Sequence, residues 1–321
     1  MAVPANTHTT FAAKNLKEDL SDVLENISPT ERPFTKALGK PGKAKALYTE
    51  WVKTSLAPAS DDNAVIEGAD ADADAANNGA RIGNYCQLSD KVASVASTAE
   101  AVDGVGDLQT MAVQIAMKTE ELALDIEKTV LSNKPAVPGV AGTTATRAAS
   151  FISFLESNVS RGAGGANPTL SGGTMGYPNA APTDGTQRAF VEDQVLSVMQ
   201  SCWEKGGKPT HIFMGGTAKT KFSQFTGNAT RYKDTTDSKV NASVDIYVTD
   251  FGELRAVPSR HMRARDAIIL DPKKAQLLFL QKAKQEPLAK TGHSDKRMVS
   301  AQWTLKVHNE AAHGHIADLT P

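Results

Sequence analysis

A chain of 321 residues with a formal net charge of −1 can bury one large core or two modest ones, and is not, as a whole, an electrostatic binder of nucleic acid. Its two cysteines, Cys86 and Cys202, exclude a disulfide scaffold and suit a reducing compartment. The sequence has no apolar run of about 18 residues, so we expect no membrane span, and its N-terminus lacks the pattern of a signal peptide.

The N-terminal region predicts a short helix over residues 17–27, after a polar start. Its apolar residues recur every three or four positions, and Ser28 and Pro29 end the pattern. A lone helix of this length is marginal in water, so its apolar stripe should pack either on its own domain or on another copy of the chain. The predicted anchors of this region are Leu20, Val23, Leu24, Ile27 and Phe34.

Residues 45–98 predict a long hairpin. Residues 45–56 resemble a strand with Trp51 as its bulkiest side chain, and residues 81–98 resume the alternation of a strand. The segment between them is rich in Ala, Asp and Asn and has too few large side chains for a core. A long hairpin without support is unstable alone, so we expect it to lie on a partner surface and name Trp51 as a further anchor.

Charge is distributed unevenly along the chain. Residues 55–110 carry ten acidic side chains against Arg81, Lys91 and no other basic residue, whereas residues 255–306 are strongly basic. Two interpretations are open. The two runs are solvated faces, or they are complementary surfaces of neighbouring identical subunits that steer assembly.

The strongest periodic signal predicts one amphipathic helix over residues 105–132. Apolar positions follow a strict alternation of three and four, and Pro135 and Pro138 end the pattern. A coiled coil is the rival interpretation, but the stripe covers only about three heptads and uses weak positions. A helix that crosses one face of a sheet fits better.

Shorter elements follow in the second half of the chain. The patterns predict helices over 148–159, 186–205 and 217–225, a loop over 161–185, and strands over 210–214, 244–249, 254–257, 267–270 and 276–280. A long final strand is predicted over 296–309, with Trp303 on its apolar face, either packed inside the subunit or beneath a contact between copies.

A search for reactive chemistry finds no candidate that outweighs an ordinary structural role. The segment HNEAAH at 308–313 lacks the two histidines four positions apart that a zinc protease needs, and we expect His313 and His315 to be partly exposed at a strand end. GGTAKTK at 215–221 lacks the glycine spacing of a phosphate loop. We therefore predict no enzyme and no catalytic, cofactor or metal site.

Several separate stretches resemble one family. KEDLSDVLENISPTERPF and YTEWVKTSLA near the start, AFVEDQVLSVMQSCWEKGGKPTHIFMGGTAKTKFSQFTGNATR, VDIYVTDFGELRAVPSR and ARDAIILDP in the middle, and LAKTGHSDKRMVSAQWTLKVHNEAAHGHIADL at the end occur in order. Together they resemble the major capsid proteins of tailed bacteriophages, the Hong Kong 97 type of shell subunit. The likeness is weakest over about 136–185.

This resemblance implies an α+β fold with five parts. Residues 1–44 are expected to form an N-terminal arm and residues 45–98 an extended loop, the E-loop, which lies across a neighbouring subunit. Residues 99–135 should hold the spine helix of a peripheral domain, and residues 136–290 most of an axial domain around the fivefold and sixfold axes. Residues 291–321 should return to the peripheral domain as its final strand and C-terminus.

The function that the resemblance implies is structural. Copies of the chain are expected to assemble as pentamers and hexamers into an icosahedral head in the host cytoplasm, and to form part of the virion. The head would contain double-stranded DNA through weak, non-specific contact, with portal, separate scaffolding and decoration proteins as further partners. The alternative is an encapsulin-like nanocompartment shell around protein cargo.

Overall fold

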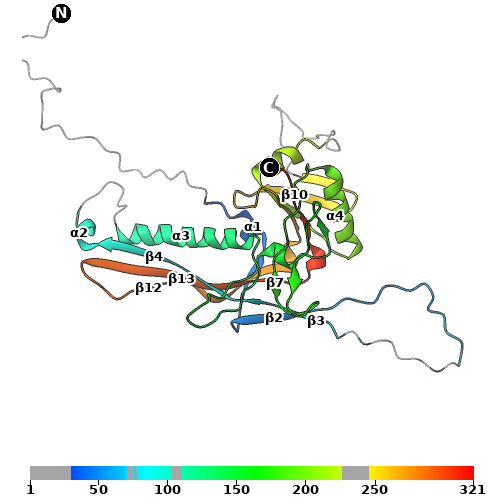
Figure 1. Ribbon diagram of the computed structural model, residues 1–321, viewed down its shortest axis with the longest axis horizontal. Coiled ribbons are helices and arrows are strands. Elements are labelled where there is room, and N and C mark those ends of the chain that lie inside the picture. Colours follow the sequence, from blue (N-terminus) through cyan, green and yellow to red (C-terminus); the bar gives the residue numbers. More distant parts are fainter. Residues whose placement is uncertain (1–29, 69, 71–75, 77, 103–109, 226–245) are drawn as a thin grey trace, which may run out of the picture.

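The computed structural model describes residues 30–68, 70, 76, 78–102, 110–225 and 246–321. Its long layer is a four-stranded sheet in the order β1 (Gly39–Lys43), β12 (Ala275–Pro287), β13 (Ser294–Val307) and β4 (Gln87–Ala96). Helix α3 (Met111–Val130) runs along one face of this sheet, as Figure 1 shows. The prediction of one helix on a sheet is confirmed over Met111–Val130, while residues 105–109 of the predicted range lie outside the described residues.

Alternation along the strands explains why α3 packs where it does. Successive strand side chains point to opposite faces, so Val299 and Ala301 face the helix and cluster with its Leu122. Ala93 and Val95 of β4 cluster with Met111 in the same way. The ion pair from Lys91 Nζ to Asp125 Oδ2, at 2.8 Å, adds a polar contact between β4 and α3.

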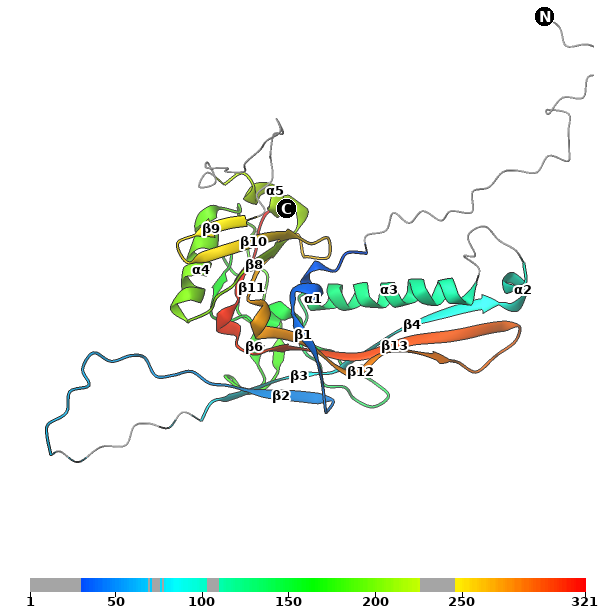
Figure 2. The same cartoon turned by 180° about the vertical axis from the view of Figure 1, so that it is seen from behind.

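The second layer is a six-stranded sheet. Its order is β5 (Val159–Ser160), β14 (Gly314–Ile316), β11 (Ala267–Leu270), β8 (His211–Met214), β10 (Gly252–Pro258) and β9 (Ile246–Thr249). Helices α4 (Glu192–Glu204) and α5 (Gly216–Phe222) share one apolar cluster with this sheet. Figure 2 shows the molecule from behind, with β9 and β10 toward the viewer. The predicted strand over 267–270 is confirmed residue by residue as β11.

The main apolar core joins the two layers. It gathers aromatic side chains from the arm, the hairpin, the short helix η2 (Phe151–Phe154) and both sheets. Phe34 contacts Phe151 and Phe213 edge-on, with ring centroids 5.2 and 5.0 Å apart. Trp303 is 1% exposed within this core, which is the first of the two roles predicted for it.

Smaller elements complete the chain. They are α1 (Pro33–Ala37), β2 (Tyr48–Lys53), β3 (Ala80–Tyr85), α2 (Ser97–Glu100), β6 (Thr169–Leu170), β7 (Pro178–Ala180), η4 (Pro272–Lys274) and η5 (Glu310–Ala312). Strands β2 and β3 form a two-stranded sheet. Residues 54–79 join these two strands and are called the extended loop from here on. Strand β4 does not continue this hairpin, because after Cys86 the chain joins β13 instead.

Four expectations need correction. The predicted helix over 148–159 is wrong, because the structure has only the short helix η2 followed by β5. All of Phe151–Phe154 is buried, rather than one face of it. The hydroxyl groups of Ser150 and Ser153 both donate to the carbonyl of Lys134. Helix α4 begins at Glu192, not at 186. Strand β12 extends to Pro287 and pairs with β13. The C-terminal segment returns as β14 to the six-stranded sheet.

Candidate assembly surfaces

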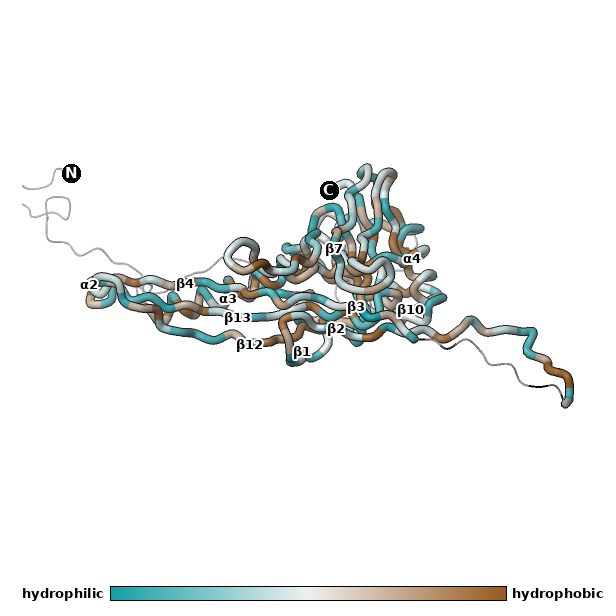
Figure 3. The backbone as a smooth tube through the Cα atoms, turned by 60° about the horizontal axis from the view of Figure 1, so that its bottom comes forward, coloured by the Kyte–Doolittle hydropathy of each residue, from teal (hydrophilic) through white to brown (hydrophobic). Residues whose placement is uncertain are grey.

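The extended loop between β2 and β3 is the most exposed apolar segment that the structure describes. Val65 is 87% exposed and Ile66 82%, and Leu56 near the root of the loop is 97% exposed. Figure 3 shows apolar colour at the loop tip, far from the body. Burying a side chain of this kind contributes about 1.5–3 kcal/mol, so a contact that removes these side chains from water would be stabilised by several kcal/mol.

The loop tip is also acidic. Asp61, Asp62, Glu67 and Asp70 are all exposed. They flank the apolar pair Val65 and Ile66 in sequence. The tip therefore combines negative charge with apolar side chains, a combination that fits a basic surface with an apolar hollow.

The opposite end of the molecule carries a hollow that combines apolar side chains with charges of both signs. The turn between β12 and β13 lies at the far end of the long axis from the loop, as Figure 1 shows. A hollow of about 210 Å³ there is lined by the apolar Met111, Pro287 and Leu288, by the basic Lys296 and Arg297, and by the acidic Glu100 and Asp295. Residues 282–297 contain five lysines and arginines against two acidic residues, so this segment has an excess of positive charge.

The root of the N-terminal arm is fixed to its own subunit. Phe34 is 0% exposed, and the carboxylate of Glu127 on α3 accepts the backbone N–H groups of Phe34 and Thr35 at 2.9 and 2.8 Å. These are N–H groups at the start of α1, which have no partner inside their own helix, so a carboxylate is favourable there. Residues 39–43 then pair with β12 as the edge strand β1.

The predicted anchors divide into two sets. Phe34 and Trp51 both lie in the core of their own subunit, where Trp51 is 7% exposed and its ring centroid is 6.0 Å from that of Phe154. Phe34 thus holds the arm, and a role of either residue beneath a contact between copies stays a prediction. The remaining four lie outside the described residues: Leu20, Val23, Leu24 and Ile27.

A buried cluster of charges holds the C-terminal segment. The carboxylate of Asp318, 0% exposed, accepts the backbone N–H groups of Gly162 and Gly185 at 3.0 and 2.8 Å and pairs with Arg265 at 2.6 Å. Burial raises the pKa of this carboxyl, but the three donors outweigh burial and hold the pKa below its ordinary value. Sequence reasoning missed this cluster, because Arg265, Gly185 and Gly162 lie 53, 133 and 156 residues from Asp318 in the chain.

We expect Asp318→Ala to lower the free energy of unfolding at pH 7 by about 3 kcal/mol, because it removes the fully buried carboxylate that accepts from the partly buried Arg265 guanidinium and from the Gly162 and Gly185 N–H groups. The folded pKa of Asp318 is depressed, so its stabilisation is full above the unfolded pKa of about 3.9 and is lost as the pH falls through the folded value. Urea unfolding from pH 7 to pH 2.5 should show the curves of the two proteins converging in acid. A constant difference across this range would contradict the assignment.

The two histidines near the C-terminus correct an expectation. His313 and His315 are 0% and 1% exposed rather than partly exposed, because β14 is enclosed between β5 and β11. Burial lowers the pKa of His313 to about 4. His315 Nε2 lies 3.3 Å from Asp266 Oδ1, and both side chains are buried.

Within the described ranges, no group of three or more His, Cys, Asp and Glu side chains is arranged to hold a metal ion. The 215–221 segment forms the short helix α5 and its preceding turn. In the same part of the chain, none of the helices is both long and apolar enough to cross a membrane. The features that stand out are therefore surfaces at the two ends of the molecule.

Comparison with known proteins agrees with this conclusion. Residues 3–320 match the protein family described as SU10 major capsid protein. A major capsid protein of Escherichia phage Phieco32 is 23% identical over 335 residues, covering 93% of this chain and 93% of the relative.

Solved structures share the fold. The capsid structure of the cyanophage P-SCSP1u has a TM-score of 0.62 at 11% identity and covers 98% of this chain and 96% of its own. The capsid asymmetric unit of cyanophage A-1(L) has a TM-score of 0.61 at 13% identity, covering 98% and 99%. A virus-like particle from Pyrococcus furiosus reaches 0.50 at 10% identity, covering 89% and 92%.

Proposed function

Because the chain belongs to the SU10 major capsid protein family, it is a structural shell subunit of a phage virion, and we propose a way in which its two ends hold neighbouring copies together. The predicted α+β capsid fold and the predicted family are confirmed. The observation that carries the proposal is the extended loop, whose apolar tip side chains are more than 80% exposed in the subunit.

In this proposal the loop tip of one subunit seats on the β12–β13 end of the next. Val65 and Ile66 enter the hollow beside Leu288, and the acidic residues around them face Lys296 and Arg297. Charges of this kind contribute more to the rate and register of association than to its strength, while the apolar side chains supply most of the affinity. Because the two surfaces lie at opposite ends, the contact is head-to-tail and repeats around a ring.

The remaining parts of the chain take the roles that the family resemblance implies. We assign residues 1–44 to the arm, 45–98 to the E-loop, 99–135 to the peripheral domain, 136–290 mostly to the axial domain, and 291–321 to the peripheral domain and C-terminus. The six-stranded sheet would then surround the fivefold and sixfold axes of pentamers and hexamers. The structure supports a modified assignment at two points, because β12 lies in the four-stranded sheet and β14 in the six-stranded one.

Contact with the contents of the shell follows from charge. A subunit with a net charge of −1 suits a shell that contains double-stranded DNA without gripping it. Assembly in the host cytoplasm, and contacts with portal, scaffolding and decoration proteins, belong to the same proposal. The encapsulin-like alternative has less support, because the phage capsid structures match this fold more completely than the virus-like particle does.

Charge reversal tests the head-to-tail contact. We expect Asp61→Lys with Asp62→Lys in the loop to slow shell formation about tenfold, and Lys296→Glu with Arg297→Glu at the other end to do the same. The four changes combined in one chain should restore the rate, because the signs again oppose each other. Light scattering follows the rate, and negative-stain electron microscopy confirms closed shells.

The control is the ionic strength of the buffer. Assembly of the unchanged protein should slow as salt rises, since exposed charges are screened over about 10 Å at 0.1 M. Rates that do not depend on salt, together with a quadruple variant no faster than either double variant, would remove the electrostatic part of the proposal. A purified protein that forms no closed shells at all would contradict the function itself.

A further inference from the structure

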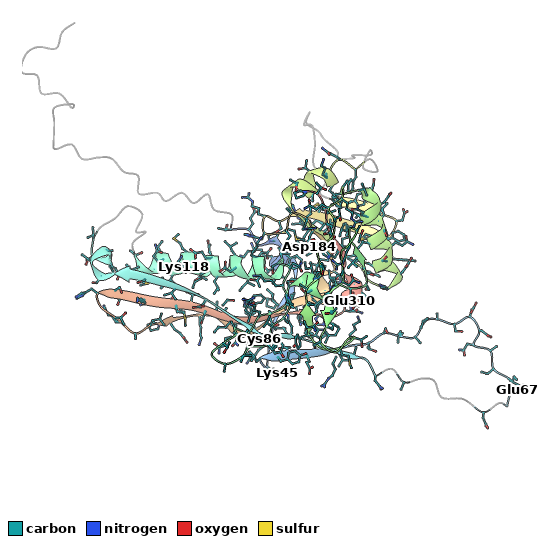
Figure 4. All side chains as sticks on the ribbon, in the orientation of Figure 1. Lys45, Glu67, Cys86, Lys118, Asp184 and Glu310 are labelled. Atoms are coloured by element: carbon teal, nitrogen blue, oxygen red, sulfur yellow. The ribbon has the colours of Figure 1, made fainter. Side chains whose placement is uncertain are left out.

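The point at which the extended loop leaves the body is fixed by a partly buried ion pair. Lys53 is the last residue of β2, and its Nζ lies 3.2 Å from Glu310 Oε1. The side chain of Glu310 is 12% exposed and that of Lys53 is 32% exposed. Figure 4 shows Glu310 close to the place where the loop starts.

Glu310 is held from a third segment of the chain. Its Oε2 accepts Ser157 Oγ at 2.8 Å, the Ser157 N–H at 3.2 Å and the Glu156 N–H at 3.4 Å. Burial raises the pKa of Glu310, but Lys53 and the Ser157 donors outweigh burial, so the pKa lies below its ordinary value. The Ser157 and Glu156 donors therefore hold one oxygen of the carboxylate, while the other oxygen faces Lys53.

The surroundings explain why this ion pair can set a direction. The two groups line a small cavity of about 110 Å³ together with the apolar side chains of Ile82, Phe154 and Val307. An ion pair with such neighbours is screened less by water than a surface pair. On the other leg of the loop, Gly79 has φ +67°, and a Cβ there would come within 2.7 Å of a methyl group of Val52, so only glycine fits where this leg meets β2.

We propose that Lys53 and Glu310 are positioning residues that aim the extended loop at the neighbouring copy. The inference rests on the proposed function of the loop as a docking element. A loop of more than twenty residues that leaves the body in a fixed direction loses less conformational freedom on docking than one that swings about its root. The ion pair acts before contact between copies, so its effect is measurable in the single subunit.

Spin-label distances test this directly. Val65→Cys at the loop tip and Ser197→Cys on α4 give two exposed labelling sites, while the native Cys86 and Cys202 are 0% exposed. In dilute, unassembled protein we expect Glu310→Gln and Lys53→Met each to broaden the distance distribution about twofold. Glu156→Gln is the matched control, because Glu156 lines the same cavity but only its backbone N–H contacts Glu310.

Each result has a defined meaning. The proposal is supported if Glu310→Gln and Lys53→Met both broaden the distances in the labelled subunit and lower the yield of shells in the unlabelled chain, which keeps Val65, while Glu156→Gln does neither. Unchanged distances in Glu310→Gln and Lys53→Met would overturn it, and so would broadened distances with shells at the unchanged yield. Circular dichroism of each variant checks the fold. If the unaltered protein forms no shells, the proposed function fails, while the distances still report whether the ion pair aims the loop.

Discussion

Replacing Phe34 with alanine is expected to lower the free energy of unfolding by about 3–5 kcal/mol. The ring is fully buried and meets Phe151 and Phe213 edge-on, so the substitution removes a large apolar side chain and leaves a cavity where both layers of the molecule join. Because the neighbours of Phe34 belong to a close-packed core, they cannot collapse fully into the space. Chemical denaturation of the unassembled subunit measures the loss.

The same substitution should also loosen the arm. Glu127 accepts the N–H groups of residues 34 and 35, and these hydrogen bonds depend on the ring that holds α1 in place. Hydrogen exchange at those two amides should therefore rise by a larger factor than exchange in the β8–β11 pairing. Lys36→Ala, at an exposed position in the same short helix, is the control and should change stability by less than about 0.5 kcal/mol. Equal effects of the two variants would mean that the ring does not anchor the arm.

The sequence predicted the elements whose signal is local. The three-four spacing around α3 and the alternation along β13 each report one face buried against a neighbour, and both elements formed as expected. The signal failed for Phe151–Phe154, where every side chain is buried and a one-sided pattern has no meaning. The same limit applies to β14, a three-residue strand enclosed in the sheet interior.

The contacts that fix the arm, the loop and the C-terminus could not be predicted in this way. Lys53 and Glu310 are 257 residues apart in the chain, and Phe34 and Glu127 are 93 apart. One signal was available but is not specific. Glu127 follows Ile126 on the buried side of an otherwise apolar stripe, and a carboxylate at such a position requires donors from elsewhere.

The loop tip carries the largest effect on assembly. Val65→Ser together with Ile66→Ser removes two apolar side chains that are 87% and 82% exposed in the subunit, so the unfolding curve of the subunit should stay within about 0.5 kcal/mol of the unchanged protein. If both side chains are buried on docking, the contact weakens by about 3 kcal/mol or more. The concentration at which shells appear should then rise about 100-fold, and sedimentation velocity measures that threshold.

A matched substitution separates docking from general surface apolarity. Val140→Ser removes an apolar side chain that is 59% exposed in the turn between Val137 and Arg147, and this residue belongs neither to the extended loop nor to the lining of the hollow. It should leave the assembly threshold within about threefold of the unchanged protein, since it lies on neither proposed docking surface. Every subunit of the shell makes the same loop contact, so a moderate loss of binding free energy per contact is enough to prevent closure. Val65 and Ile66 can therefore decide whether the particle forms although they have no effect on folding. An assembly threshold that moves equally for both variants, or for neither, would show that the apolar tip does not dock.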